Sequence, residues 1–242
     1  MIGLGRALRT SRVAQATEIA LVFLVAAAVV AVGWRLVGAN PLGRQAVVWV
    51  ANILMLVTVW IGLRLRAQTW EHFGLSLRWN GRRALGRTVL QSIVVCVLAL
   101  AAFVVGTVAM KNVTVAPAGA DLSGYNYLQG NLPLLLLALA AVYVVSSFGE
   151  EMLYRGFLIN RLAEIGSAGR LAWSVSIVTS AVVFGLAHFD WGIVGIVQTA
   201  FMGLALAISY LVTKRNLWAL VLAHAYIDTL LLVQMYSGVA PP

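Results

Sequence analysis

Long apolar stretches alternate with short polar segments along the whole chain. A helix needs about 17 to 25 residues to cross a hydrocarbon core about 30 Å thick, and seven stretches reach that length. The pattern therefore predicts an all-α fold, a polytopic bundle of about seven transmembrane helices, or eight if a loop hides a further half-span. The expected spans are 18–38, 46–63, 88–110, 132–154, 171–188, 191–212 and 217–235.

The composition narrows the class of protein. Hydrophobic residues make up 62% of the 242 positions and charged residues 10%, against roughly 45 to 50% and 25% in an ordinary soluble domain. This excludes a soluble globular protein and predicts a single integral membrane domain over residues 1–242. Cys96 is the one cysteine, so neither an internal disulfide nor a cysteine metal site is available.

The basic residues lie between the apolar stretches, where they act as orientation signals and give no reason to expect a nucleic-acid partner. On alternate sides of the expected spans, 14 of the 17 Lys and Arg residues fall on the side of the N-terminus. We therefore expect a plasma (inner) membrane protein, bacterial by its preference for Arg over Lys, with the N-terminus cytoplasmic and the C-terminus external.

One connecting segment has a distinct composition. Residues 64–87 combine six Arg with Trp70, Phe73, Leu75 and Trp79, which predicts a basic interfacial segment on the cytoplasmic leaflet. His72 lies in the same segment without a partner at helical spacing, and we expect it at the membrane interface.

Ionisable residues inside the apolar spans indicate a functional or structural role, because a charge at a helix centre costs roughly 2.5 to 3.5 kcal/mol on insertion scales. They gather late in the chain. Glu151 and Arg155 are four residues apart and share a helix face, as do His224 and Asp228. If Arg155 neutralises Glu151, Glu150 remains as the free carboxylate, which makes it the candidate general base.

Three motifs in these spans resemble those of the CPBP intramembrane proteases, the family of CAAX proteases and bacteriocin-processing enzymes also called Abi. Glu150-Glu151-x-x-Tyr154-Arg155 is similar to the EExxxR signature, Phe184-x-x-x-His188 to the second motif and His224-x-x-x-Asp228 to the third. They occur in the family's order within about residues 145–230. The helices over 132–235 are therefore the expected catalytic region.

The resemblance implies an endopeptidase that hydrolyses peptide bonds of membrane-associated proteins or peptides, lipidated or not, in contact with membrane lipid. It implies Glu150 as general base, His188 as the residue that holds the attacking water, and His224 as an oxyanion stabiliser. Glu151, Arg155 and Asp228 would support them. Asp228 stands where the family often has Asn, and an ionised Asp cannot donate to an oxyanion, so we expect it to orient His224.

Two questions stay open at this level. The resemblance favours a site without a cofactor, but Glu150, His188 and His224 would also supply a zinc site of two His and one carboxylate. A non-catalytic membrane adaptor or immunity protein, or a small proton- or cation-coupled transporter, would fit the same residues.

Straight helices would also place Glu150 and His188 about 20 Å apart, at about 1.5 Å per residue. The catalytic interpretation therefore requires the fourth helix to continue to about Leu162, with the fifth helix tilted or short.

Overall fold

The computed structural model describes residues 2–76, 81–113 and 119–238. Within these ranges every regular element is helical. Six helical runs are long and apolar enough to cross a membrane, and a seventh apolar helix of 17 residues is shorter. This confirms the predicted all-α membrane bundle. The elements are α1 Ile2–Thr10, α2 Arg12–Val37, α3 Pro41–Leu65, η1 Trp70–Phe73, α4 Arg82–Val113, η2 Ser123–Leu128, α5 Leu132–Val142, η3 Tyr143–Phe148, η4 Glu151–Ile159, α6 Asn160–Ile165, α7 Arg170–Leu186, η5 Phe189–Trp191, α8 Gly192–Val212 and α9 Leu217–Ser237.

Polar caps fix several helix starts. The Asn40 side chain accepts a hydrogen bond from the Gly43 N–H at 2.8 Å, and Pro41 begins α3. Asn131 caps α5 in the same way, accepting from the Leu134 N–H at 3.2 Å. These side chains satisfy backbone donors that have no partner within the helix.

The fourth span is longer than the sequence pattern predicts. The expected end was residue 154, but α5, η3, η4 and α6 form one helical run over Leu132–Ile165. Two parts of it, η3 and η4, are π-helical, with i→i+5 hydrogen bonds and a wider turn than an α-helix. The continuation beyond Leu162 and the short α7 are the two conditions that the catalytic interpretation requires.

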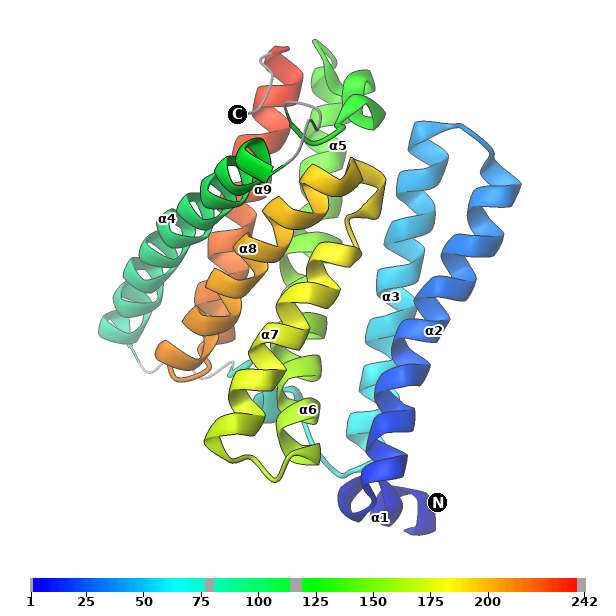
Figure 1. Cartoon of the computed structure of the whole chain (residues 1–242), viewed down its shortest axis with the longest axis vertical. Coiled ribbons are helices and arrows are strands. Elements are labelled where there is room, and N and C mark those ends of the chain that lie inside the picture. Colours follow the sequence, from blue (N-terminus) through cyan, green and yellow to red (C-terminus); the bar gives the residue numbers. More distant parts are fainter. Residues whose placement is uncertain (1, 77–80, 114–118, 239–242) are drawn as a thin grey trace.

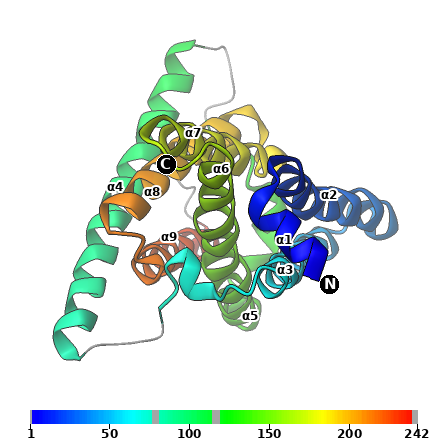
Figure 2. The same ribbon diagram turned by 90° about the horizontal axis from the view of Figure 1, so that it is seen from below.

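This fourth span lies at the centre of the bundle. Figure 2 shows α5 and α6 passing through the middle, with α7, α8 and α9 on one side and the α2–α3 hairpin on the other. In Figure 1 the hairpin stands apart from α4, which packs against α8 and α9. All residues from Glu151 to Ile159 are buried. Polar groups on this helix are therefore held inside protein and away from lipid.

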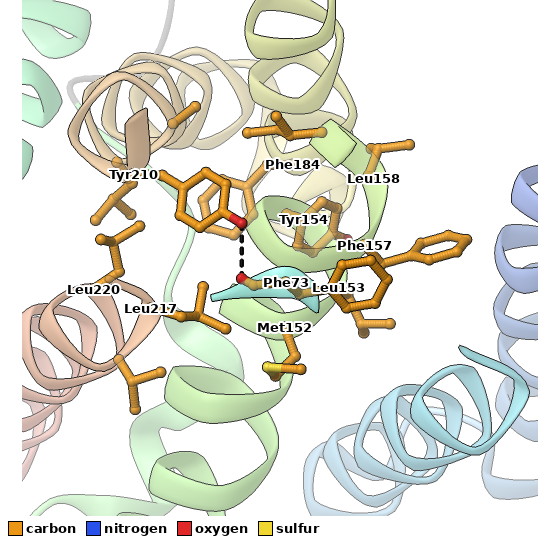
Figure 3. Packing of buried hydrophobic residues seen from close by; sticks show 14 of the residues in the cluster. Phe73, Met152, Leu153, Tyr154, Phe157, Leu158, Phe184, Tyr210, Leu217 and Leu220 are labelled. Atoms are coloured by element: carbon orange, nitrogen blue, oxygen red, sulfur yellow. Dashed lines mark hydrogen bonds between the residues drawn. The ribbon is translucent and has the colours of Figure 1, made fainter. Parts of the chain in front are cut away.

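The core includes part of the segment predicted to be interfacial. Phe73 is fully buried and packs edge-on against Phe157 with ring centroids 6.2 Å apart. The Tyr210 hydroxyl donates to the Phe73 carbonyl at 2.7 Å (Figure 3). This part of 64–87 is folded into the bundle, while Arg78 and Trp79 lie outside the described residues. The position of the whole segment on the cytoplasmic leaflet stays a prediction.

Candidate active site

A buried ion pair forms the inner part of the site. Arg155 donates through Nη1 to Glu151 Oε1 at 2.8 Å, and neither side chain is exposed. Arg155 Nη2 donates to the Gly203 carbonyl on α8 at 3.2 Å. The guanidinium also lies 4.3 Å from the centre of the Phe184 ring on α7. Arg155 therefore links the fourth span to two neighbouring helices.

The same carboxylate holds His224, which is buried on α9. His224 Nδ1 lies 2.8 Å from Glu151 Oε1, and since an ionised carboxylate only accepts, Nδ1 carries the proton of this bond. Glu151 therefore fixes both the position and the orientation of the His224 ring. The sequence assigned that task to Asp228, whose Oδ1 is 3.6 Å from His224 Nε2, beyond hydrogen-bond distance.

Two further carboxylates face the outer nitrogen of His224. Glu150 Oε2 lies 4.0 Å from Nε2, and Asp228 lies on the same side of the ring. Asp228 Oδ2 accepts a hydrogen bond from Ser147 Oγ at 2.7 Å. Ser147 belongs to η3, so this bond ties α9 to the π-helical part of the fourth span. Three carboxyl groups thus surround one imidazole.

Glu150 and Glu151 are neighbours in sequence but differ in access to water. The Glu150 side chain is 14% exposed, whereas Glu151 is completely buried. Glu151 Oε1 is bonded by both Arg155 and His224, and the Oε2 atom of each of the two carboxylates is buried without a hydrogen-bond partner among the described residues. Of the two carboxylates, Glu150 is the one that solvent reaches.

His188 approaches the cluster from the end of α7. Its Nδ1 lies 2.8 Å from the Phe184 carbonyl, and because a carbonyl only accepts, Nδ1–H is the donor. In the neutral ring Nε2 then carries the free lone pair. The Phe184 ring lies beside both imidazoles, with centroids 4.8 Å from His188 and 6.2 Å from His224. Phe184 therefore connects the second and third motifs.

Aromatic residues of η2 and η5 lie next to His188 at this end of the site. Trp191 contacts His188 edge-on at 4.8 Å between ring centroids, and Tyr125 of η2 contacts Trp191 at 6.3 Å. Burial raises the pKa of Tyr125 above its usual range, so the phenol stays protonated at neutral pH. The sequence around η2 gives no sign that this segment folds back to the site.

The zinc alternative can be compared with the side-chain positions. Across the described ranges, no group of three or more His, Cys, Asp or Glu side chains is arranged to hold a metal ion. The expectation of a site without a cofactor remains a prediction, as does the zinc alternative.

Sequence reasoning missed two parts of the site. The π-helical geometry around Glu150 has no residue signature, although Ser146 and Ser147 mark a polar interruption in the apolar run. Gly203 on α8 is the second part, and nothing in the sequence links it to the motif residues. A side chain there would place its Cβ 2.8 Å from Phe184 Cδ1, and the Gly203 carbonyl also accepts from Arg155.

Replacing Gly203 by Ala is therefore expected to lower the stability of the folded protein by about 1 to 3 kcal/mol, the usual cost of overpacking. The added methyl group would push the Phe184 ring toward Arg155 and the two histidines. Thermal unfolding of the purified protein measures the effect. Gly86→Ala is the control, because a Cβ at Gly86 on α4 meets no atom within 4 Å. Equal melting temperatures for the two variants would contradict this account of the packing.

The fold and the site together describe a polytopic helical membrane protein with a buried cluster of carboxylates and histidines around its central helix. Residues 132–230 match the family model described as Type II CAAX prenyl endopeptidase Rce1-like. The match confirms the resemblance to the CPBP and CAAX protease family over this part of the chain. All six expected site residues lie within it, and because this is a protease family, the match supports protease activity. Neither a curated protein nor a solved structure matches the chain.

Proposed function

We propose that the protein is an intramembrane endopeptidase in which Glu150 activates the attacking water. The observation that carries the proposal is the difference between two adjacent carboxylates at the centre of the bundle. Glu151 is completely buried and its Oε1 is bonded by Arg155 and His224, whereas the Glu150 side chain is 14% exposed and is hydrogen-bonded by neither of them. A general base has to lie within reach of the water from which it takes the proton, and of these two carboxylates only Glu150 is exposed.

The histidines have separate tasks in this proposal. His188 accepts a hydrogen bond from the water at Nε2, since its Nδ1–H is committed to the Phe184 carbonyl. His224, as an imidazolium, offers Nε2–H to the oxyanion that develops on the attacked carbonyl. Glu151 would stabilise that positive ring through Nδ1. Asp228, held by Ser147, would place a second negative charge near Nε2.

Water activation in this scheme uses side chains alone. Glu150 takes the proton from water as the oxygen attacks the peptide carbonyl, and it returns the proton to the leaving amine. Glu151 and Arg155 act on position only, because both side chains are completely buried and bond to each other, to His224 and to the Gly203 carbonyl.

The substrate class follows from where the site lies. Glu150 is in the middle of the Leu132–Ile165 span, far from either end. A peptide that reaches it has to enter the membrane region, so the proposed substrates are membrane-associated proteins or peptides, with or without a lipid group. We further propose that the N-terminus is cytoplasmic, as the distribution of basic residues predicts.

The proposal is tested by comparing the termini of membrane proteins, by mass spectrometry, in cells that carry the wild-type chain and cells that carry Glu150→Ala. We expect at least one terminus that depends on the wild-type chain. If all termini are unchanged while both proteins accumulate equally, the protease proposal fails and an adaptor role replaces it. Ion flux in proteoliposomes that depends on Glu150 would instead support a transporter.

A further inference from the structure

A second charged cluster lies at the end of the bundle that contains the chain's N-terminus. Arg66 pairs with Glu18 through Nη2 and Oε2 and approaches Glu164 at 3.5 Å. Arg161 pairs with Glu164 at 2.9 Å. His72, which the sequence left without a partner, lies 2.9 Å from Glu164 through Nε2. The positive charges of the two arginines equal the negative charges of the two glutamates.

A hollow of about 420 Å³ opens beside this cluster. Its lining combines cationic and amide side chains with one carboxylate that is already paired: Arg9, Gln15, Arg66, Gln68, Glu164 and Ala168. Gln15 and Arg66 are more than nine-tenths buried, so the inner wall of the hollow is set by the fold.

Arg9 is the unbalanced charge of this hollow. Its guanidinium makes one hydrogen bond, from Nη1 to the Arg66 carbonyl at 3.1 Å, and contacts no carboxylate in the described part of the chain. Its other N–H groups are free to bind a ligand. With Glu164 and Glu18 matched by Arg66 and Arg161, Arg9 leaves the lining with an excess positive charge.

The position of Arg9 depends on close packing of α1 against the end of α3. A Cβ on Gly5 would overlap the Leu65 carbonyl oxygen, so glycine is needed for this approach. The contact brings the following turn of α1 beside Arg66. The sequence showed Arg9 only as one of several orientation charges, because it lies 57 positions from the carbonyl that it contacts.

The hollow is separate from the candidate active site. Glu164 follows Glu150 by 14 residues on the same helical run, so several helical turns separate the two side chains. The hollow also lies where α2 begins and α3 ends, which is the level of the headgroups for helices that cross a bilayer.

We propose that this hollow binds a phosphate group, with Arg9 as its principal ligand, and that a membrane phospholipid supplies the phosphate. A guanidinium matches phosphate oxygens with two parallel N–H donors, and neighbouring amides add further donors. The location at the ends of two spans favours a lipid headgroup over free phosphate. The site does not depend on the catalytic proposal.

Native mass spectrometry of the full chain, released from bilayers that contain phosphatidylglycerol and phosphatidylcholine, tests the site. Arg9→Gln is expected to lower the retained phosphatidylglycerol on the order of tenfold, the effect of losing a hydrogen bond to a charged group. Arg6→Gln is the matched control, because Arg6 is exposed on the same helix and does not line the hollow. It should retain as much lipid as the wild type.

A parallel arm uses inorganic phosphate as the probe in thermal unfolding. If phosphate stabilises the wild type and Arg6→Gln but not Arg9→Gln, while lipid retention is equal in all three, phosphate is the ligand and its source is free phosphate. Arg9→Lys keeps the charge but not the two parallel N–H donors of the guanidinium, and this variant should retain an intermediate amount of lipid. If the two Arg9 variants and Arg6→Gln behave alike with both probes, the proposal is overturned.

Discussion

Replacing Arg155 by Met should destabilise the folded protein by about 3 to 5 kcal/mol, the cost of removing one partner from a buried ion pair. Glu151 would keep its charge in a position that is closed to water, with one oxygen already unpartnered. The Gly203 carbonyl would also lose a donor. Thermal unfolding of the purified variant measures this loss, and we expect it to be the largest stability effect among single substitutions in the site.

The double variant Glu151→Gln, Arg155→Met separates charge from packing. It removes the bare carboxylate, so it should be more stable than Arg155→Met alone, although His224 loses its ionised partner. Should the double variant be as unstable as the single one, the loss would come from side-chain packing, and the ion pair would not have the role described above.

Glu150→Gln is expected to reduce peptide hydrolysis by about 10² to 10⁴-fold, the usual contribution of a general base. The amide keeps the size of the side chain but cannot take a proton from water. Because Glu150 is partly exposed and its Oε2 has no partner, the melting temperature should stay near that of the wild type. The readout is the rate of cleavage by purified variants in liposomes, with a substrate found by the comparison of termini.

Glu151→Gln is the matched comparison at the adjacent position. It should lower the melting temperature as well as the rate, since Arg155 and His224 both depend on the Glu151 carboxylate. The roles of the two residues would be exchanged if Glu151→Gln lowered the rate but not the melting temperature while Glu150→Gln lowered the melting temperature but not the rate.

Apolar length predicts most of the fold, because crossing a membrane constrains a helix more strongly than packing in water does. The error at the fourth span has a physical cause. Arg155 and Arg161 look like the end of an apolar stretch, but both are buried in ion pairs, so the helix continues to Ile165. Composition alone cannot distinguish a charge in solvent from a charge with a buried partner.

The site was predictable only where spacing along one helix decides the contact. The pair Glu151 and Arg155 follows from four-residue spacing. The contact of His224 with Glu151 joins positions 73 residues apart, and the motifs predicted that both residues lie in one site but not that they are in contact. Nothing in the sequence pointed to Glu18 as the partner of Arg66, because these residues lie on different helices and 48 positions apart.

The most direct test of the central claim is cleavage by two purified proteins, the wild type and Glu150→Gln, in identical liposomes with the same membrane-protein substrate. The account predicts new peptide termini with the wild type, none above background with Glu150→Gln, and equal melting temperatures for the two. Equal rates of terminus formation would show that Glu150 is not the base and would contradict the account.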